Sequence, residues 1–217
     1  MIESTIKQFI CPFCGNAEDS KKKKTREHIP AKGMFVNMTS DLITVPACKT
    51  CNNGSSHDDF KFMIDMGIYI GSDAPEFWQK TIKSLNRNAK RKKYKNLILD
   101  RTSVIQVPAP YGGYGHPYKA DKLSIDRGVR KIVKGLSWYT RKQIILNDQV
   151  IRISMLKQGH NIAPKYQGIL DLQGNSIITG GGDFKAQYLF HDGNEVDSVW
   201  KISFYNVDCF ICVVHSK

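Results

Sequence analysis

The residues best suited to chemistry are four cysteines in two C-x2-C pairs, Cys11-Pro-Phe-Cys14 and Cys48-Lys-Thr-Cys51. Each pair offers two thiolates from one tight turn. Two such turns complete the four-sulfur tetrahedral shell that zinc prefers in structural sites. The alternative is two unrelated pairs of buried thiols, which the paired spacing disfavours. We therefore expect a structural Zn²⁺ ion bound by Cys11, Cys14, Cys48 and Cys51.

A second group of reactive side chains lies in and just after the segment between the two cysteine pairs. Glu27 and His28 are adjacent and closely precede Pro30, and Asn52 directly follows Cys51, the fourth cysteine. An imidazole with an ordinary pKa near 6.5 can take a proton from water at neutral pH. A carboxylate and an amide carbonyl are hard oxygen ligands that suit Mg²⁺ or Mn²⁺. Zinc prefers the soft cysteine sulfurs, whereas Mg²⁺ or Mn²⁺ prefers hard oxygen ligands, so two different metal sites are expected. A general base beside such an ion suits metal-assisted hydrolysis of a phosphodiester.

The ordered combination of the cysteine pairs with the segments EHIP and CKTCNN resembles the zinc-containing HNH endonucleases. The resemblance covers about residues 9–65. It implies a ββα-metal fold pinned by zinc, with His28 as the general base. It also implies that Glu27 and Asn52 hold a catalytic Mg²⁺ or Mn²⁺ ion, separate from the zinc.

Two further positions of the family pattern have more than one interpretation here. The family's middle asparagine, which orients the catalytic histidine, corresponds to Asp41 or Asn37. His57 is either an additional metal ligand or an exposed residue near the start of a helix, and we expect the exposed position. Asp58 and Asp59 are expected in the first turn of that helix, where the helix dipole favours carboxylates.

The net charge of the chain indicates the class of its binding partner. The 217 residues include 32 Lys and Arg against 20 Asp and Glu, a formal net charge of +12, which favours a polyanion such as nucleic acid. Almost all of this excess lies in residues 61–217. We expect phosphate contacts from a set of exposed cations, with a solvated surface as the alternative. The set is Lys21, Lys22, Lys23, Lys24, Arg26, Lys90, Arg91, Lys92 and Lys93.

Apolar spacing predicts the elements that position these groups. Residues 60–70 have helical spacing, with Ser56 as a candidate cap, and a second helix is expected to begin at Pro75. A third, basic amphipathic helix is expected around residues 125–136. Alternation then predicts an antiparallel sheet of about five strands, in which Cys209 and Cys212 pack in the core. The candidate strands are 149–156, 167–172, 176–180, 184–190, 198–205 and 209–214.

The expected fold class is α+β. We expect an HNH nuclease domain with its four-cysteine zinc site in residues 1–70 and a basic helical segment in 71–107. A Gly/Pro linker should follow in 108–117, then a domain of a helix plus an antiparallel sheet in 118–217.

The resulting hypothesis is a metal-dependent DNA endonuclease that uses zinc and either magnesium or manganese. A role in phage defence or in a mobile element would suit such an enzyme. We expect a cytoplasmic protein with no membrane partner, because the chain has no signal peptide and no apolar run of membrane length. A homodimer or a regulatory protein partner would restrain the activity. The alternatives are an RNase and a non-catalytic zinc module that binds nucleic acid or protein.

Overall fold

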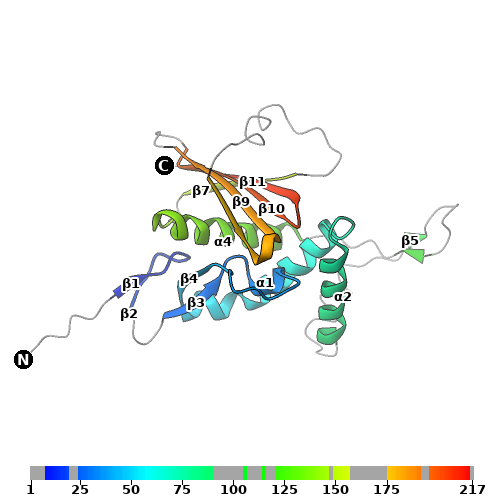
Figure 1. The fold of residues 1–217 in the computed structure, drawn as a ribbon. Helices are drawn as coiled ribbons and strands as arrows, with labels where there is room; N and C mark the ends of the chain where they lie inside the picture. The colour runs from blue at the N-terminus through cyan, green and yellow to red at the C-terminus, as the bar shows by residue number, and fades with distance from the viewer. Residues whose placement is uncertain are drawn as a thin grey trace, which may run out of the picture.

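The fold is a mixture of helices and antiparallel sheet, in agreement with the expected α+β class (Figure 1). The structure is a computed structural model. It describes residues 8–19, 24–89, 105–106, 114–115, 121–146, 149–156, 175–191 and 196–215. Within these residues, no helix has the length and apolar character needed to cross a membrane.

Two short hairpins form the amino-terminal part. Strand β1 (Gln8–Ile10) pairs antiparallel with β2 (Ala17–Asp19), and the first cysteine pair lies in the turn between them. Strand β3 (Lys24–His28) pairs antiparallel with β4 (Thr44–Cys48). The connection between β3 and β4 contains the 3-10 helix η1 (Lys32–Met34).

Helix α1 (Lys49–Tyr69) begins directly after β4, and the expected helix start near Ser56 is wrong. The Sγ atom of Cys48 accepts a hydrogen bond from the N–H of Cys51 at 3.4 Å, which caps the first turn. The first ten residues of the helix are mostly polar, so they show no apolar stripe from which a helix could be read. Asp59 therefore lies in the third turn of α1, where the helix dipole does not explain it.

Helix α2 (Pro75–Ala89) begins at the expected proline. Its buried face differs from the expected stripe through Trp78 and Ile82, because Phe77 and Thr81 point into the core and Ile82 is exposed. The Phe77 ring stacks on the Tyr205 ring at 5.0 Å between centroids, so α2 contacts the carboxy-terminal part of the chain.

Helix α4 (Lys122–Arg141) contains the predicted basic amphipathic segment, and all of its expected apolar residues are buried. Asp121 caps its start, because the Oδ1 atom accepts a hydrogen bond from the N–H of Leu123 at 3.0 Å. Lys142 ends it in the left-handed conformation, with φ of 58°. Strands β5 (Ile105–Gln106) and β6 (Tyr114–Gly115) form a separate short pair.

The carboxy-terminal part is the predicted antiparallel sheet, with the strand order β7-β11-β10-β9-β8. Its strands are β7 (Val150–Met155), β8 (Asn175–Thr179), β9 (Phe184–Phe190), β10 (Ser198–Phe204) and β11 (Val207–His215). Cys209 and Cys212 are fully buried in β11, as expected. The 3-10 helix η2 (Gly180–Gly182) joins β8 to β9. The expected strand at 167–172 lies outside the described residues.

Helix α4 lies between the sheet on one side and the β3–β4 hairpin with α1 on the other (Figure 1). Two glycines allow its close approach. A Cβ atom at Gly128 would lie 2.4 Å from the Phe62 ring of α1, and one at Gly135 would lie 2.5 Å from Ile29. Phe62 also meets Phe204 of β10, so one continuous core joins residues from both halves of the chain. The proposed domain limits after residues 70, 107 and 117 stay a prediction.

Candidate functional site

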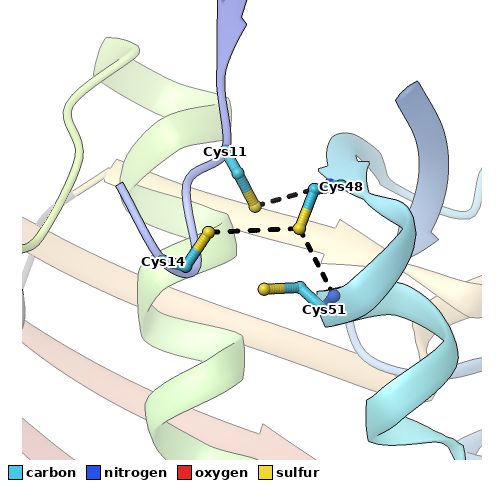
Figure 2. A group of neighbouring side chains, drawn as sticks. All are labelled: Cys11, Cys14, Cys48 and Cys51. Atoms are coloured by element: carbon cyan, nitrogen blue, oxygen red, sulfur yellow. Dashed lines mark hydrogen bonds between the residues drawn. The ribbon is translucent and has the colours of Figure 1, made fainter. Parts of the chain in front are cut away.

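The two cysteine pairs converge on one point (Figure 2). The four Sγ atoms all lie within 4.8 Å of one another, and those of Cys14 and Cys48 are 4.0 Å apart. Zinc bonded to sulfur at about 2.3 Å in a tetrahedron requires sulfur atoms about 3.8 Å apart. The cluster therefore fits a metal ion such as zinc after contraction by less than about one ångström. Among the described residues, it is the one group of three or more His, Cys, Asp or Glu side chains that converges in this way.

Backbone donors favour the thiolate form of one of the four cysteines, Cys11. The N–H of Cys48 donates to the Sγ atom of Cys11 at 3.5 Å. Burial acts to raise the pKa of the Cys11 thiol, but backbone hydrogen bonds from Cys48, Phe13 and Cys14 outweigh it and hold this pKa below its usual value. Burial raises the pKa of Cys51, and the neighbouring thiols raise it further. Several thiolates this close together need a cation, and zinc supplies one.

Helix α4 supplies a positive charge beside the cluster. The Nζ atom of Lys134 donates a hydrogen bond to the backbone carbonyl of Phe13, within the first cysteine turn, at 3.2 Å. Burial lowers the pKa of Lys134, and the nearby Cys51 and Cys14 act in the opposite direction. Four thiolates on one Zn²⁺ carry a net negative charge, so an ammonium beside the cluster would stabilise the loaded site.

The alternation of β3 separates the two members of the Glu27-His28 pair. Glu27 points inward and is 5% exposed, whereas Lys24 and Arg26 are exposed on the other face of the strand. His28, at the end of β3, belongs by alternation to the same face as Lys24 and Arg26 and is half-buried. The structure thus places the carboxylate toward α1 and α4, and the imidazole on the cationic side of the hairpin.

Glu27 forms an ion pair that the sequence did not reveal. Its Oε1 atom lies 2.8 Å from the Nζ atom of Lys131 on α4. The same ammonium donates to both Asp59 carboxylate oxygens, at 2.8 and 2.7 Å, and to the Ser55 hydroxyl at 2.8 Å. Burial raises the pKa of Glu27, and the Lys131 ammonium opposes this rise. One ammonium therefore links β3, α1 and α4 through two carboxylates.

Asn52 lies in the first turn of α1 and contacts the strand that carries Glu27. Its Nδ2 atom donates a hydrogen bond to the backbone carbonyl of Arg26 at 3.2 Å. This bond uses the amide nitrogen, so the amide oxygen is the ligand atom that Asn52 can offer to a cation. The residue after the fourth cysteine is thereby held against β3.

The His28 ring has the protonation state that a general base needs. Burial lowers its pKa below the usual value, and the charge of Lys32 lowers it further. A lowered pKa favours the neutral imidazole, which is the form that can accept a proton. Within the part of the chain that the structure describes, no hydrogen bond to this ring is present.

Neither candidate for the orienting residue engages His28 among the described contacts. The backbone carbonyl of Asp41 accepts a hydrogen bond from the Thr179 hydroxyl at 2.6 Å, and its carboxylate accepts one from the N–H of Gly181 in η2 at 3.3 Å. Asn37 is exposed. An orienting role for Asp41 or Asn37 stays a prediction.

The remaining predicted residues fall into three groups. Lys24 and Arg26 are exposed, as phosphate contacts require. His57 is half-buried on α1, contrary to the expected exposed position, and it does not belong to the converging cysteine cluster. Lys21, Lys22, Lys23, Lys90, Arg91, Lys92 and Lys93 lie outside the described residues.

Sequence reasoning missed Ser55, Asp59 and Lys131. Asn52, Ser55 and Asp59 lie three, four and seven residues apart, which places them on one face of a helix once its start at Lys49 is known. Local sequence carries no signal for Lys131, because its partner Glu27 is more than 100 residues away in the chain.

Comparison of the chain with protein-family models, with curated proteins and with solved structures found no match. Function is therefore inferred from the residues and their geometry.

Proposed function

We propose that this chain is a metal-dependent endonuclease that hydrolyses phosphodiester bonds, with DNA as the expected substrate. The observation that carries the proposal is the hydrogen bond from Asn52 to the carbonyl of Arg26. It holds Asn52, the residue after the fourth cysteine, against the strand that contains Glu27 and His28. The convergence of the four cysteines supports the same arrangement, because a bound zinc would tie β4 and α1 to the β1–β2 turn.

The roles follow from the chemistry of each side chain. The neutral imidazole of His28 takes the proton from the attacking water. Arg26 and Lys24, on the same face of β3, neutralise the charge of the phosphate. A divalent ion bound to Glu27 and Asn52 would stabilise the negative charge that develops in the transition state. The ion pair with Lys131 uses Oε1 of Glu27, so Oε2 is the oxygen left for such an ion.

The test is cleavage of supercoiled plasmid by purified, zinc-loaded protein with Mg²⁺ or Mn²⁺. We expect His28→Ala to lower the rate about 100-fold or more, the usual contribution of a general base. His191→Ala, which removes an exposed histidine after β9, is the matched control and should cleave normally. Zinc content should be one ion per chain in all three proteins. Equal cleavage by the His28→Ala protein would remove His28 from the mechanism, and a parallel RNA substrate separates DNase from RNase.

A second candidate is a non-catalytic zinc module that binds nucleic acid or protein. The observation that favours it is the Lys131 ammonium, which already satisfies both Glu27 and Asp59 without a metal ion. In that case, calorimetric titration of the zinc-loaded protein with Mn²⁺ gives no heat of binding, and no cleavage is seen. Binding of Mn²⁺ that is lost in Glu27→Gln would exclude this candidate.

A further inference from the structure

A pocket of about 620 Å³ is bordered by the β3–β4 hairpin. One wall is formed by the hairpin and by β1, and the other by the end of α4 and the residues after it. Trp138, half-buried near the end of α4, forms part of its lining, and we name it the Trp138 pocket. Its lining residues are Phe9, Ile10, Lys24, Arg26, Thr44, Val45, Pro46, Trp138, Lys142 and Ile144.

The lining combines positive charge with aromatic rings. Lys24, Arg26 and Lys142 contribute three cations, and no Asp or Glu is among the described residues of the lining. The Nζ atom of Lys142 lies 4.0 Å from the centroid of the Trp138 ring, and that of Lys24 lies 5.8 Å from the Phe9 ring. All three cations are exposed, so their long stems can move to an anion that enters the pocket.

The pocket borders the candidate base. Thr44, one of its lining residues, is the direct cross-strand partner of His28. Alternation places Lys24, Arg26 and His28 along one face of β3, about 7 Å apart from one to the next. A chain of anions with a similar repeat, such as the phosphates of an extended strand, can therefore follow β3 from the pocket to His28.

We propose that the Trp138 pocket binds single-stranded nucleic acid, with one unstacked base against the Trp138 ring and the flanking phosphates on Lys24, Arg26 and Lys142. Stacking on aromatic rings within a cationic groove is the usual way in which proteins hold single strands without sequence preference. Binding of the strand does not require the proposed nuclease activity, but its cleavage after binding rests on the proposed function. It names the substrate as a strand whose bases are unpaired next to the cleaved bond.

The aromatic wall selects this substrate over the alternatives. A base in a continuous duplex is stacked on both faces, so it cannot pack against a tryptophan in the wall of a pocket. An acidic peptide would satisfy the three cations, but it gives the indole ring no flat partner.

A second cationic pocket provides the matched control. It lies on α2, has a volume of about 690 Å³, and is lined by Lys80, Lys83 and Arg87 together with Glu76. None of its described lining residues is aromatic. Lys83 and Arg87 are exposed, so replacing both removes two surface charges from a pocket that lacks a stacking ring.

The experiment measures fluorescence anisotropy of a labelled twelve-nucleotide thymidine strand. It uses the zinc-loaded full-length chain with His28→Ala, so that the probe stays intact. Trp138→Ala should weaken binding about 5- to 100-fold, the range expected for the loss of one stacked base, and Trp138→Phe should retain most of the affinity. Arg26→Ala should lower the slope of log affinity against log salt by about 0.7. The Lys83→Ala/Arg87→Ala control should bind within about twofold of the parent.

Other probes test the inference without changing the protein. An abasic strand of the same length should bind at least about fivefold more weakly than the thymidine strand, even if Trp138→Ala fails to fold. A uridine strand separates RNA from DNA within the same chemistry. Equal affinity for the abasic strand, tighter binding of a matched duplex, or equal binding of an acidic peptide would overturn the inference.

The proposed function is tested separately, because it concerns cleavage rather than binding. A chain that binds the thymidine strand through Trp138 but cleaves nothing fails only as a nuclease. A chain that nicks plasmid equally well with Trp138→Ala, and binds the strand equally well, remains a nuclease but does not use this pocket.

Discussion

Replacing Lys131 with methionine should destabilise the fold substantially. The Lys131 ammonium contacts Glu27 at 2.8 Å and Asp59 at 2.7 Å, and the side chains of these two acids are 7% and 20% exposed. Methionine keeps most of the apolar stem of lysine, so the main loss is the charge. Two carboxylates on facing elements would then lack their shared cation.

The structure sets the size of the effect. Removing one partner from a buried ion pair costs about 3–5 kcal/mol, because a charge is left buried and unpaired. Water reaches Asp59, so the lower end of this range applies, and we expect a loss of about 3 kcal/mol. For a chain of this length, that corresponds to a fall in melting temperature of roughly 6–12 °C.

The stability lost in Lys131→Met should be larger at neutral pH than at acidic pH. Burial raises the pKa of Glu27, and the Lys131 ammonium holds that rise back. Without the ammonium, this pKa rises further, so the carboxylate accepts a proton more readily in the folded state than in the unfolded state. The penalty is therefore full above the raised pKa, and it shrinks as the pH falls toward the unfolded value near 4.3.

The assay is thermal unfolding of zinc-saturated protein followed by circular dichroism, at neutral pH and at pH 5. The control is Lys122→Met, which removes an exposed lysine from the first turn of the same helix. The triple variant Glu27→Gln/Asp59→Asn/Lys131→Met should recover part of the loss, because it leaves no unpaired charge. A Lys131→Met protein that melts within about 2 °C of the Lys122→Met protein would refute the shared role of this ammonium.

Further outcomes follow from the geometry. Cys51→Ala should abolish binding of the single zinc ion per chain and lower the melting temperature, and undiminished zinc content by mass spectrometry would contradict the four-sulfur site. Gly128→Ala should destabilise the protein by about 1–3 kcal/mol in guanidinium unfolding, because its Cβ would overlap a phenylalanine ring of α1. Gly54→Ala, at an α1 position with nothing within 4 Å, should instead stabilise it by up to about 1 kcal/mol, and equal effects of the two changes would show that the close approach of α4 is not rigid. Burial raises the pKa of Cys209 to about 12, so iodoacetamide at pH 8 should leave this thiol unmodified until the protein unfolds, as peptide mass mapping would show. If His28 is the base, the cleavage rate should rise with pH through a pKa below 6.5 and then level off on that limb, whereas a midpoint above 6.5 would contradict the burial of the imidazole.

Local sequence patterns were enough to place the carboxy-terminal strands. Candidate strand 184–190 matches β9 in full, and 198–205 differs from β10 by one residue. Alternating apolar residues and clear turn signals make such antiparallel strands readable. The first turns of α1 were missed because Lys49–Asp59 is polar and its cap is a cysteine sulfur, which is not among the usual capping groups.

The candidate site was predictable only where it depends on spacing. The two C-x2-C pairs predicted the convergence of the cysteines. Asn52 was expected as a metal ligand, which stays a prediction, and its hydrogen bond to β3 was not expected. The partner of Glu27 could not be predicted, because Lys131 reaches it only through the packing of α4 on α1. Long-range packing of this kind depends on the whole core, and a single sequence carries no periodic signal for it.

The glycines at the α4 interface also set a limit on how the chain can be divided. A fragment that ends before Asp121 would expose Phe62 and Ile29. In the whole chain, α4 covers these two side chains with Gly128 and Gly135, where a residue larger than glycine would overlap them. Such a fragment would keep all four cysteines and the complete β3–β4 hairpin, yet it would carry a large apolar surface. The smallest part of the chain that can fold independently around these residues is then the β3–β4 hairpin together with α1 and α4. Another protein with the same packing should have two glycines seven residues apart at the positions of Gly128 and Gly135. It should also have a lysine at the position of Lys131, three residues after the first glycine.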